Sequence, residues 1–212
     1  MSIQSKILKT SAFCFSVAAA QQQKPNVIFI AIDDLRDFIG CYGTNPDIKT
    51  PNIDRLAARG IAFTNAHVQA PFSAPSRNSL LTGMLPSTTG AYDFQPYDSI
   101  DAFRNISPLP QHFRENGYYV AGTGKIFHNS DWNILKKTFD VFYSETENAV
   151  WNQTEHITNP KENIAVDKGH FNWGPTDQPD SILEEVKRTD FIISELQKKH
   201  ELPFFIGIGY IK

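Results

Sequence analysis

Cysteine is scarce in this chain, which has only Cys14 and Cys41 among its 212 residues. Runs of basic residues are missing, and so are apolar runs long enough to cross a bilayer. The formal net charge is -3, whereas a general binder of nucleic acid or of membrane surfaces needs an excess of basic residues. The sequence also has no internal repeats and no low-complexity tracts. These absences argue against polybasic binders, membrane-spanning proteins and repeat proteins.

The first 20 residues differ in character from the rest. Lys6 and Lys9 precede a short apolar stretch, residues 11–20, that ends in three alanines. This order is typical of a secretory signal peptide. We therefore expect residues 1–20 to be a signal peptide and the protein to be periplasmic or secreted; a disordered cytoplasmic leader is the alternative. Cys14 would leave with this segment, and no intrachain disulfide would then be possible.

Apolar content is that of a globular protein with a core, because 41% of the residues are hydrophobic and 12% are aromatic. Three apolar runs, residues 27–32, 118–123 and 202–210, show no alternation of polar and apolar positions. Such runs predict strands that are buried on both faces of a parallel sheet. Since helical patterns separate the runs, the sequence favours an α/β fold with a mostly parallel, doubly wound sheet.

Helix signals fill most of the chain between these strands. Residues 61–63 are predicted to form a short extra strand. Residues 143–179 show neither helical nor strand periodicity, which predicts an irregular segment. His156 and His170 within this segment are predicted to be solvated. The first three predicted helices are a packing helix capped by Thr50 and closed by Gly60, a short helix closed by Gly83, and a helix from Ser107 to Gly117. The last predicted helix begins with a capping box at Ser181 to Glu184 and reaches about Lys199. Its apolar face is formed by Ile182, Val186, Ile193 and Leu196.

Two adjacent carboxylates, Asp33 and Asp34, follow the first predicted strand. Ligands of α/β sheets gather outside the carboxyl ends of the strands, so the pair lies where a site is expected. Neighbouring carboxylates repel each other unless a positive charge intervenes, and a hard divalent cation with oxygen ligands supplies one. The alternative is structural, with one aspartate capping the next turn and the other solvated.

A short polar motif, Ser-x-Pro-Ser-Arg, begins at Ser73 and ends at Arg77. We expect Ser73 to lie just before a helix N-terminus, where free backbone N–H groups and the helix dipole favour a bound oxyanion. A hydroxyl in that place is a candidate nucleophile facing an anion. In the alternative reading, Ser73 is only a helix cap and Arg77 is only a surface charge.

A cation and an imidazole follow the second predicted strand, because Lys125 and His128 come directly after residues 118–123. At the site edge of a sheet such groups can bind an anion and transfer a proton. At this close spacing they can also be ordinary surface residues.

Together these segments resemble the sulfatase family of the alkaline phosphatase superfamily, and within it the iduronate-2-sulfatase branch. The resemblance implies an alkaline phosphatase-like fold with helices on both faces of the sheet, incomplete at the C-terminus, with residues 21–212 as the N-terminal part of a sulfatase catalytic domain. The segments that carry it are Ser73 to Arg77 with the following Leu-Thr-Gly, Asp33-Asp34-Leu35-Arg36, Gly40-Cys41-Tyr42-Gly43, Tyr92-Asp93-Phe94, Glu115-Asn116-Gly117-Tyr118, and Gly124-Lys125-Ile126-Phe127-His128.

The resemblance also implies a role for each candidate residue. Asp33, Asp34 and Ser73 would hold a calcium ion, and a serine-type maturation enzyme would oxidise Ser73 to formylglycine, which attacks sulfur. Arg77 would brace the modified residue. The residues implied to contact the sulfate are Lys125, His128 and Lys212.

The implied activity is the hydrolysis of sulfuric esters on sulfated sugars, as in glycosaminoglycan degradation. The family pairs Asp33 and Asp34 with later ligands that this sequence does not contain, so we expect the chain alone to be inactive. We also expect the strand at residues 203–210 to lack a cover and to expose an apolar edge. Two alternatives are a metal-dependent phosphoesterase that uses unmodified Ser73 and a non-catalytic remnant that binds sulfated glycans.

Overall fold

The structure is a computed structural model that describes residues 24–128, 132–144 and 179–211. Lys212, the expected signal peptide, His156 and His170 lie outside these residues, as does most of the segment at residues 143–179. In the described part of the chain, no helix has both the length and the apolar character that crossing a membrane requires.

Four parallel strands form one sheet in the order β1-β4-β2-β3. They are β1 (Val27–Ile32), β2 (Tyr119–Gly124), β3 (Val141–Tyr143) and β4 (Phe204–Tyr210). The last strand in sequence therefore lies between the first two, and the helix of residues 132–138 connects β2 to its neighbour β3. The predicted α/β fold with a parallel, doubly wound sheet is confirmed.

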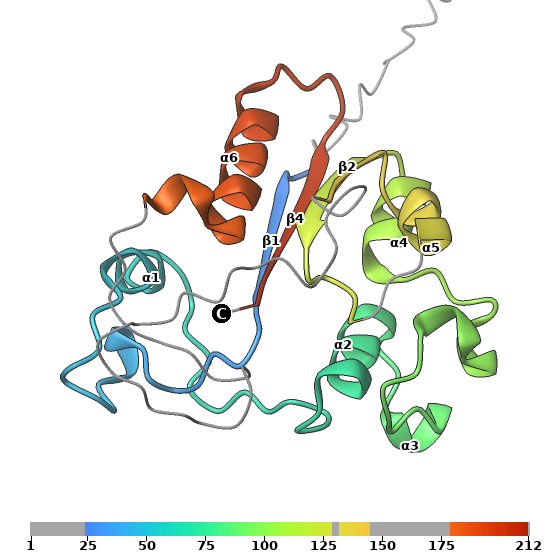
Figure 1. The fold of residues 1–212 in the computed structure, drawn as a ribbon, viewed down its shortest axis with the longest axis horizontal. Helices are drawn as coiled ribbons and strands as arrows, with labels where there is room; N and C mark the ends of the chain where they lie inside the picture. The colour runs from blue at the N-terminus through green and yellow to red at the C-terminus, as the bar shows by residue number, and fades with distance from the viewer. Residues whose placement is uncertain (1–23, 129–131, 145–178, 212) are drawn as a thin grey trace, which may run out of the picture.

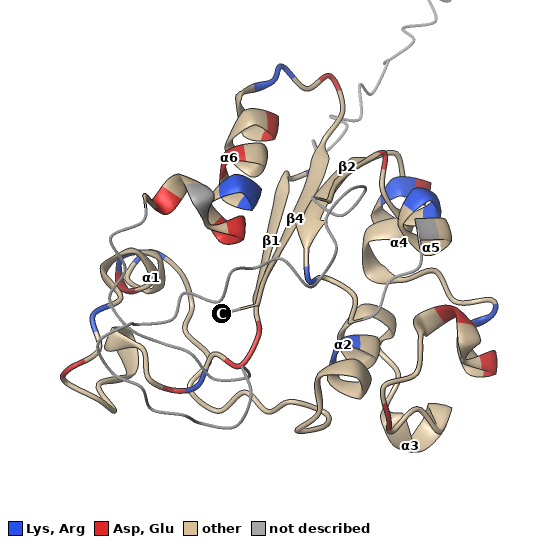
Figure 2. Cartoon of the chain, viewed as in Figure 1, with Lys and Arg blue, Asp and Glu red and all other residues tan. Residues whose placement is uncertain are grey.

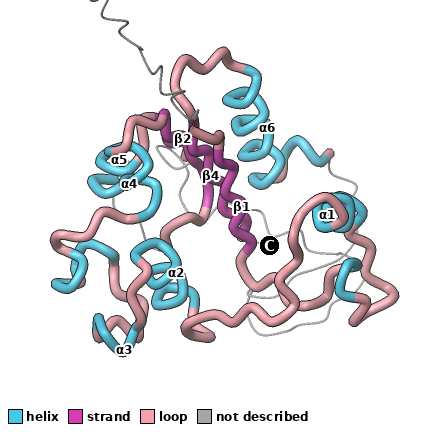
Figure 3. Tube along the Cα trace, turned by 180° about the vertical axis from the view of Figure 1, so that it is seen from behind, coloured by secondary structure: helices cyan, strands magenta, loops and turns pink. Residues whose placement is uncertain are grey.

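Helices cover both faces of the sheet, as Figures 1 and 3 show from opposite sides. One face packs on α4 (Leu109–Glu115) and α5 (Trp132–Thr138), where Val120 and Phe205 join the larger core cluster. The other face packs on α6 (Glu184–Gln197), through a smaller cluster that includes Ala121, Ile192 and Ile206. Successive residues of a strand point to opposite faces, so each central strand contributes to both clusters.

The remaining helices belong to the long connections at the carboxyl end of the sheet (Figure 1).

The prediction of a strand at residues 61–63 was wrong, because these residues form neither strand nor helix and are exposed. The packing helix was wrong in extent and burial: α1 ends before Gly60 and buries no residue. The other helices are α1 (Pro51–Ala57), α2 (Ser73–Thr82), α3 (Pro86–Thr89) and the short 3-10 helices Gly40–Tyr42, Tyr97–Ser99, Asp101–Phe103 and Asp180–Ile182.

Burial of the strands differs from the expectation in two places. The first strand was predicted to be buried on both faces, but Ile28 and Ile30 of β1 are 51% and 54% exposed. The strand at residues 203–210 was predicted to expose an apolar edge, but β4 has a partner on each side and its Phe205 and Ile206 are buried. Both errors have one cause: β4 occupies the centre of the sheet, while β1 lies at its edge and α6 contacts β2 and β4.

The predictions for the start and the buried face of α6 were also wrong. Ser181 lies in a 3-10 helix and Leu183 is the N-cap without a side-chain hydrogen bond, so the capping box does not form. Ile193 and Leu196 are partly exposed, whereas Ile192 and Glu195 are buried. The Glu195 carboxylate is tolerated inside because it accepts hydrogen bonds from Tyr119 Oη (2.8 Å) and Lys198 Nζ (2.5 Å).

Candidate functional site

The candidate residues meet at the carboxyl end of the sheet. Asp33 follows β1, and Lys125 follows β2; both strands are parallel to β4, which lies between them. Figure 2 shows an acidic segment where the chain leaves β1 and basic segments after β2 and in α2, gathered at this end. The topology thus brings together residues that lie 92 positions apart in sequence.

Two glycines allow the segment after β2 to cross the end of β4. Gly124 has a φ of +71°, and the next residue, Lys125, donates its backbone N–H to the Gly209 carbonyl at 2.8 Å. A Cβ atom on Gly209 would overlap the Lys125 carbonyl group. The backbone of Lys125 is therefore held directly on the end of the central strand.

Ser73 and Arg77 are four positions apart on α2 and so lie on one face of that helix. The Arg77 Nε atom donates to Ser73 Oγ at 3.3 Å, and its Nη1 atom donates to the carbonyl groups of Lys125 and Ile126. Ser73 is the first residue of α2, with Phe72 as the N-cap, so the prediction that it precedes the helix was wrong by one position. The predicted closure by Gly83 is confirmed by a left-handed C-cap.

The Asp33 carboxylate is shared by three partners. Arg77 Nη2 donates to Oδ1 at 2.8 Å, Lys125 Nζ donates to Oδ2, and Ser73 Oγ donates to Oδ1 at 3.3 Å. Burial by itself raises the pKa of Asp33, but the hydrogen bonds and positive charges of Lys125 and Arg77 outweigh it and hold that pKa below its ordinary value. Asp33 is therefore ionised at neutral pH, beside two cations.

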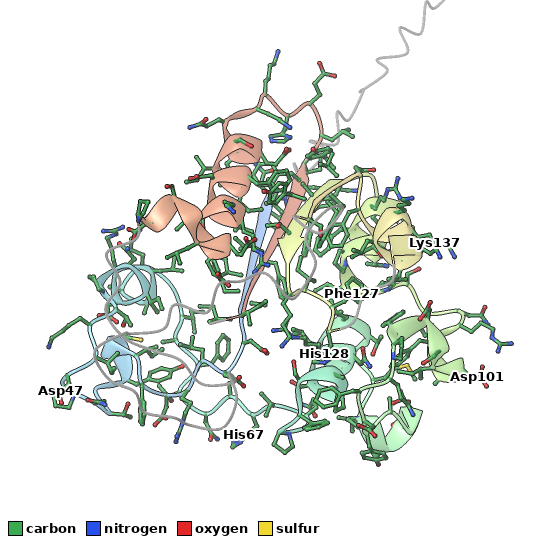
Figure 4. All side chains as sticks on the ribbon, viewed as in Figure 1. Asp47, His67, Asp101, Phe127, His128 and Lys137 are labelled. Carbon is green, nitrogen blue, oxygen red and sulfur yellow. The ribbon has the colours of Figure 1, made fainter. Side chains whose placement is uncertain are left out.

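His128 follows Lys125 at the edge of this cluster, and Figure 4 labels it beside α2. Burial lowers the pKa of His128, and the positive charges of Lys125 and Arg77 lower it further, against a smaller opposing effect of Asp33. The imidazole is therefore neutral at pH 7. Its ring stacks on Phe94 with 4.7 Å between ring centroids.

Asp34 lies outside the ion-pair cluster. It is exposed, and among the described residues it is the only one other than glycine with a positive φ, 55°. This left-handed conformation, which aspartate tolerates better than most residues, turns the chain away from the sheet. In the described ranges, no group of three or more His, Cys, Asp or Glu side chains is arranged to hold a metal.

A hard divalent cation fits the donors in kind but not in number. Asp33, Asp34 and Ser73 offer oxygen atoms, and two of these residues already touch. Calcium takes about six to eight oxygen ligands, so these residues can form only part of a shell. The inner cluster fits an anion as well, because Arg77 and Lys125 bring two positive charges against the single charge of Asp33.

Comparison with protein-family models matches residues 25–212 to the family described as Sulfatase. The chain belongs to the sulfatase family. This sulfatase chain is 34% identical over 199 residues to a sulfatase of Formosa agariphila, covering 88% of the chain and 38% of that relative. It is 33% identical over 222 residues to human iduronate 2-sulfatase, covering 97% of the chain and 39% of that relative. The chain thus spans about two fifths of the length of these relatives.

A solved structure with the same fold is the phosphonate monoester hydrolase of Agrobacterium radiobacter. It matches the sulfatase chain with a TM-score of 0.65 at 19% sequence identity, covering 89% of this chain and 41% of that one. At this identity the match supports the fold alone. The expected alkaline phosphatase-like fold is confirmed.

The structure brings most of the predicted site residues of the sulfatase chain together. Asp33 contacts Ser73, Arg77 and Lys125, and Arg77 also contacts Ser73 and the Lys125 carbonyl group. Asp34 stands apart, and Lys212 lies outside the described residues. Phe94, which stacks on His128, was not among the predicted site residues, although Tyr92-Asp93-Phe94 was one of the segments that carried the resemblance.

The stability of the sulfatase chain should depend on pH through His128. Since the folded-state pKa lies below the ordinary value of 6.5, the unfolded chain takes up a proton first as the pH falls. Stability should therefore be full above pH 6.5 and decrease as the pH drops from there toward the folded-state pKa. Urea unfolding between pH 8 and pH 5 measures this, and His128→Gln should flatten that part of the curve. His67→Gln, at an exposed loop histidine, is the control; an equal flattening by both variants would contradict the assignment.

Proposed function

We propose that the protein is a sulfuric ester hydrolase that acts on sulfated sugars. The substrate class is proposed from its relatives, which are named iduronate 2-sulfatase. The observation that carries the proposal is the contact of Ser73 with both Arg77 and Asp33 at the carboxyl end of the sheet. A hydroxyl held between a cation and a carboxylate, beside a second cation, is placed to react with an anionic ester.

Each residue has a defined part in this proposal. Arg77 braces Ser73 through Nε. Lys125 and His128 bind the sulfate. Because the His128 imidazole is neutral, it can also exchange a proton with the bound ester. Asp33, Asp34 and Ser73 would contribute oxygen ligands to a calcium ion, whose charge would neutralise the sulfate oxygens. Lys212 is proposed as a further sulfate contact.

Ser73 is proposed to act as formylglycine, made by a serine-type maturation enzyme. One hydroxyl of the hydrated aldehyde attacks sulfur and displaces the sugar alcohol, which takes up a proton. Loss of the proton from the other hydroxyl then re-forms the aldehyde and breaks the C–O bond to the sulfate, a second step that a plain serine cannot perform. This part of the proposal rests on the Ser-x-Pro-Ser-Arg motif and on membership of the sulfatase family. A periplasmic or secreted location is proposed from residues 1–20.

Peptide mass spectrometry tests the modification directly. In protein isolated from its native host, the peptide that contains Ser73 should be lighter by two hydrogen atoms than its sequence requires. Ser76, in the same motif, serves as the internal control and should retain its hydroxyl. Unmodified Ser73 in active host-derived protein would overturn the formylglycine proposal.

Calcium binding tests the acidic pair. Asp34→Ala should weaken calcium binding at least about tenfold, because one charged ligand of a partial shell is lost. The chain should remain folded because Asp34 is exposed, at a cost of about 1 kcal/mol for alanine in the left-handed conformation. Isothermal titration calorimetry measures the affinity. Asp37→Ala, at an exposed acid three positions further along the same loop, is the matched control. Equal calcium affinities in the two variants would show that Asp34 is not a ligand.

A second candidate function is a metal-dependent phosphoesterase that uses unmodified Ser73. The 3.3 Å contact from Ser73 Oγ to the ionised Asp33 carboxylate favours it, since a hydroxyl beside a carboxylate can act as a nucleophile without modification. Turnover of a phosphonate monoester, but not of an aryl sulfate, by protein with unmodified Ser73 would favour this candidate.

A further inference from the structure

Three aromatic rings form a row beside the candidate site. Phe94 lies 4.7 Å from the His128 ring, with 22° between the ring planes, and 4.1 Å from the Phe72 ring, with 39° between the planes. Phe72 is the residue directly before Ser73 and is the N-cap of α2. The row therefore connects the backbone that carries Ser73 to the imidazole that follows β2.

Phe94 is not part of either core cluster. Its side chain is 47% exposed, so burial of apolar surface explains its presence poorly. Aromatic pairs at these centroid separations gain energy beyond the area they bury. Within the described residues, the interactions of Phe94 are these two ring contacts and the hydrogen bond that its backbone N–H donates to the Asp93 carboxylate.

His128 needs an orienting contact of this kind. A functional histidine is usually oriented by a hydrogen bond to one ring nitrogen. In the described part of the chain, however, the buried Nδ1 atom of His128 has no hydrogen-bond partner. The stacked Phe94 ring is the contact that is available to restrain the tilt of the imidazole.

We propose that Phe94 is a positioning residue that fixes the orientation of the His128 ring relative to Ser73 through the row formed with Phe72. The role of His128 in turnover rests on the proposed function, but the positioning itself does not. A small misplacement of a reacting group can reduce a rate by about a hundredfold. Phe94 therefore affects the rate without touching the reacting atoms.

The first test is a direct measurement on His128 in the 212-residue chain. With ¹³C-labelled histidine and His128→Gln to assign its signal, the His128 ring protons should show an upfield ring-current shift. Phe94→Leu should remove that shift, and Phe94→Tyr should keep it. Tyr92→Leu is the matched control, because Tyr92 is an exposed aromatic residue two positions away with no ring contact in the described residues. A His128 signal that Phe94→Leu leaves unchanged would overturn the proposal.

The second test is kinetic and uses the matured enzyme in its longest form with an aryl sulfate. Phe94→Leu should lower kcat by about ten- to a hundredfold with KM changed by no more than about twofold, and Phe94→Tyr should restore most of kcat. A Phe94→Leu variant no slower than Tyr92→Leu would overturn the proposal. So would a rise in KM for sugar sulfates alone, because that result would make Phe94 a surface for the sugar ring.

The two tests separate this inference from the proposed function. One outcome is that the wild-type protein hydrolyses no sulfate ester, while the His128 ring-current shift of the wild type is absent from Phe94→Leu. The positioning is then supported and the proposed function fails. If wild-type protein is active and Phe94→Leu changes neither readout, the proposed function stands and the positioning is wrong.

Discussion

Arg77→Met is expected to lower the free energy of unfolding by about 3–5 kcal/mol, as the removal of one partner from a buried ion pair generally does. Arg77 is 6% exposed and donates to Ser73 Oγ, to Asp33 Oδ1 and to the carbonyl groups of Lys125 and Ile126. Methionine fills a similar volume but donates no hydrogen bond, so these acceptors lose their partner. Activity should be lost with stability, because the segments after β1 and β2 and the start of α2 are tied together through this one side chain.

Urea unfolding of the variant measures the effect on stability. Arg104→Met is the control, because Arg104 also pairs with an aspartate, Asp101, but both side chains are at least 75% exposed. An exposed pair contributes about 0–1 kcal/mol. Arg77→Lys separates charge from geometry: it keeps the positive charge and loses the planar fork, so it should fall between wild type and Arg77→Met. A loss in Arg77→Met no larger than that in Arg104→Met would contradict the structural role of Arg77.

Residues 21–212 alone are expected to hydrolyse sulfate esters at least about a thousandfold more slowly than a longer form with further metal ligands, which corresponds to a loss of about 4 kcal/mol in transition-state stabilisation. The physical reason is the partial metal shell. Asp33, Asp34 and Ser73 supply too few oxygen atoms for calcium, and Asp33 is engaged by Arg77 and Lys125. Without a firmly bound metal, the charge of the sulfate is poorly neutralised.

The experiment expresses residues 21–212 with a serine-type maturation enzyme and assays an aryl sulfate beside the longer form. Mass spectrometry at Ser73 confirms that both proteins carry the same modification, so that any difference in rate reports the missing ligands. Comparable rates would show that residues 21–212 need no further metal ligands and that the proposed metal shell is wrong. Binding of a sulfated oligosaccharide without turnover in both forms would instead favour the non-catalytic glycan-binding alternative.

Only part of the site could be predicted from local sequence. A run of β-branched and aromatic residues followed by polar ones marks the end of a buried strand. This pattern correctly predicted that Asp33 and Lys125 lie at the carboxyl ends of the strands. The contact of Ser73 with Arg77 follows from the helical period. The difference between Asp33 and Asp34 could not be predicted, because it depends on a left-handed turn at Asp34 and on cations from two other elements.

The sequence by itself determined the α/β class, the positions of β1, β2 and β4, the glycine at the end of α2 and the motifs that indicate the sulfatase family. Each of these features is encoded by residues within one turn or one strand. Tertiary structure alone decided which strand is central, which side of β1 stays exposed, which residues of α6 are buried and that Phe94 stacks on His128. Strand order and helix placement are set by contacts between segments far apart in the chain. The energies of those contacts depend on packing that no local pattern records.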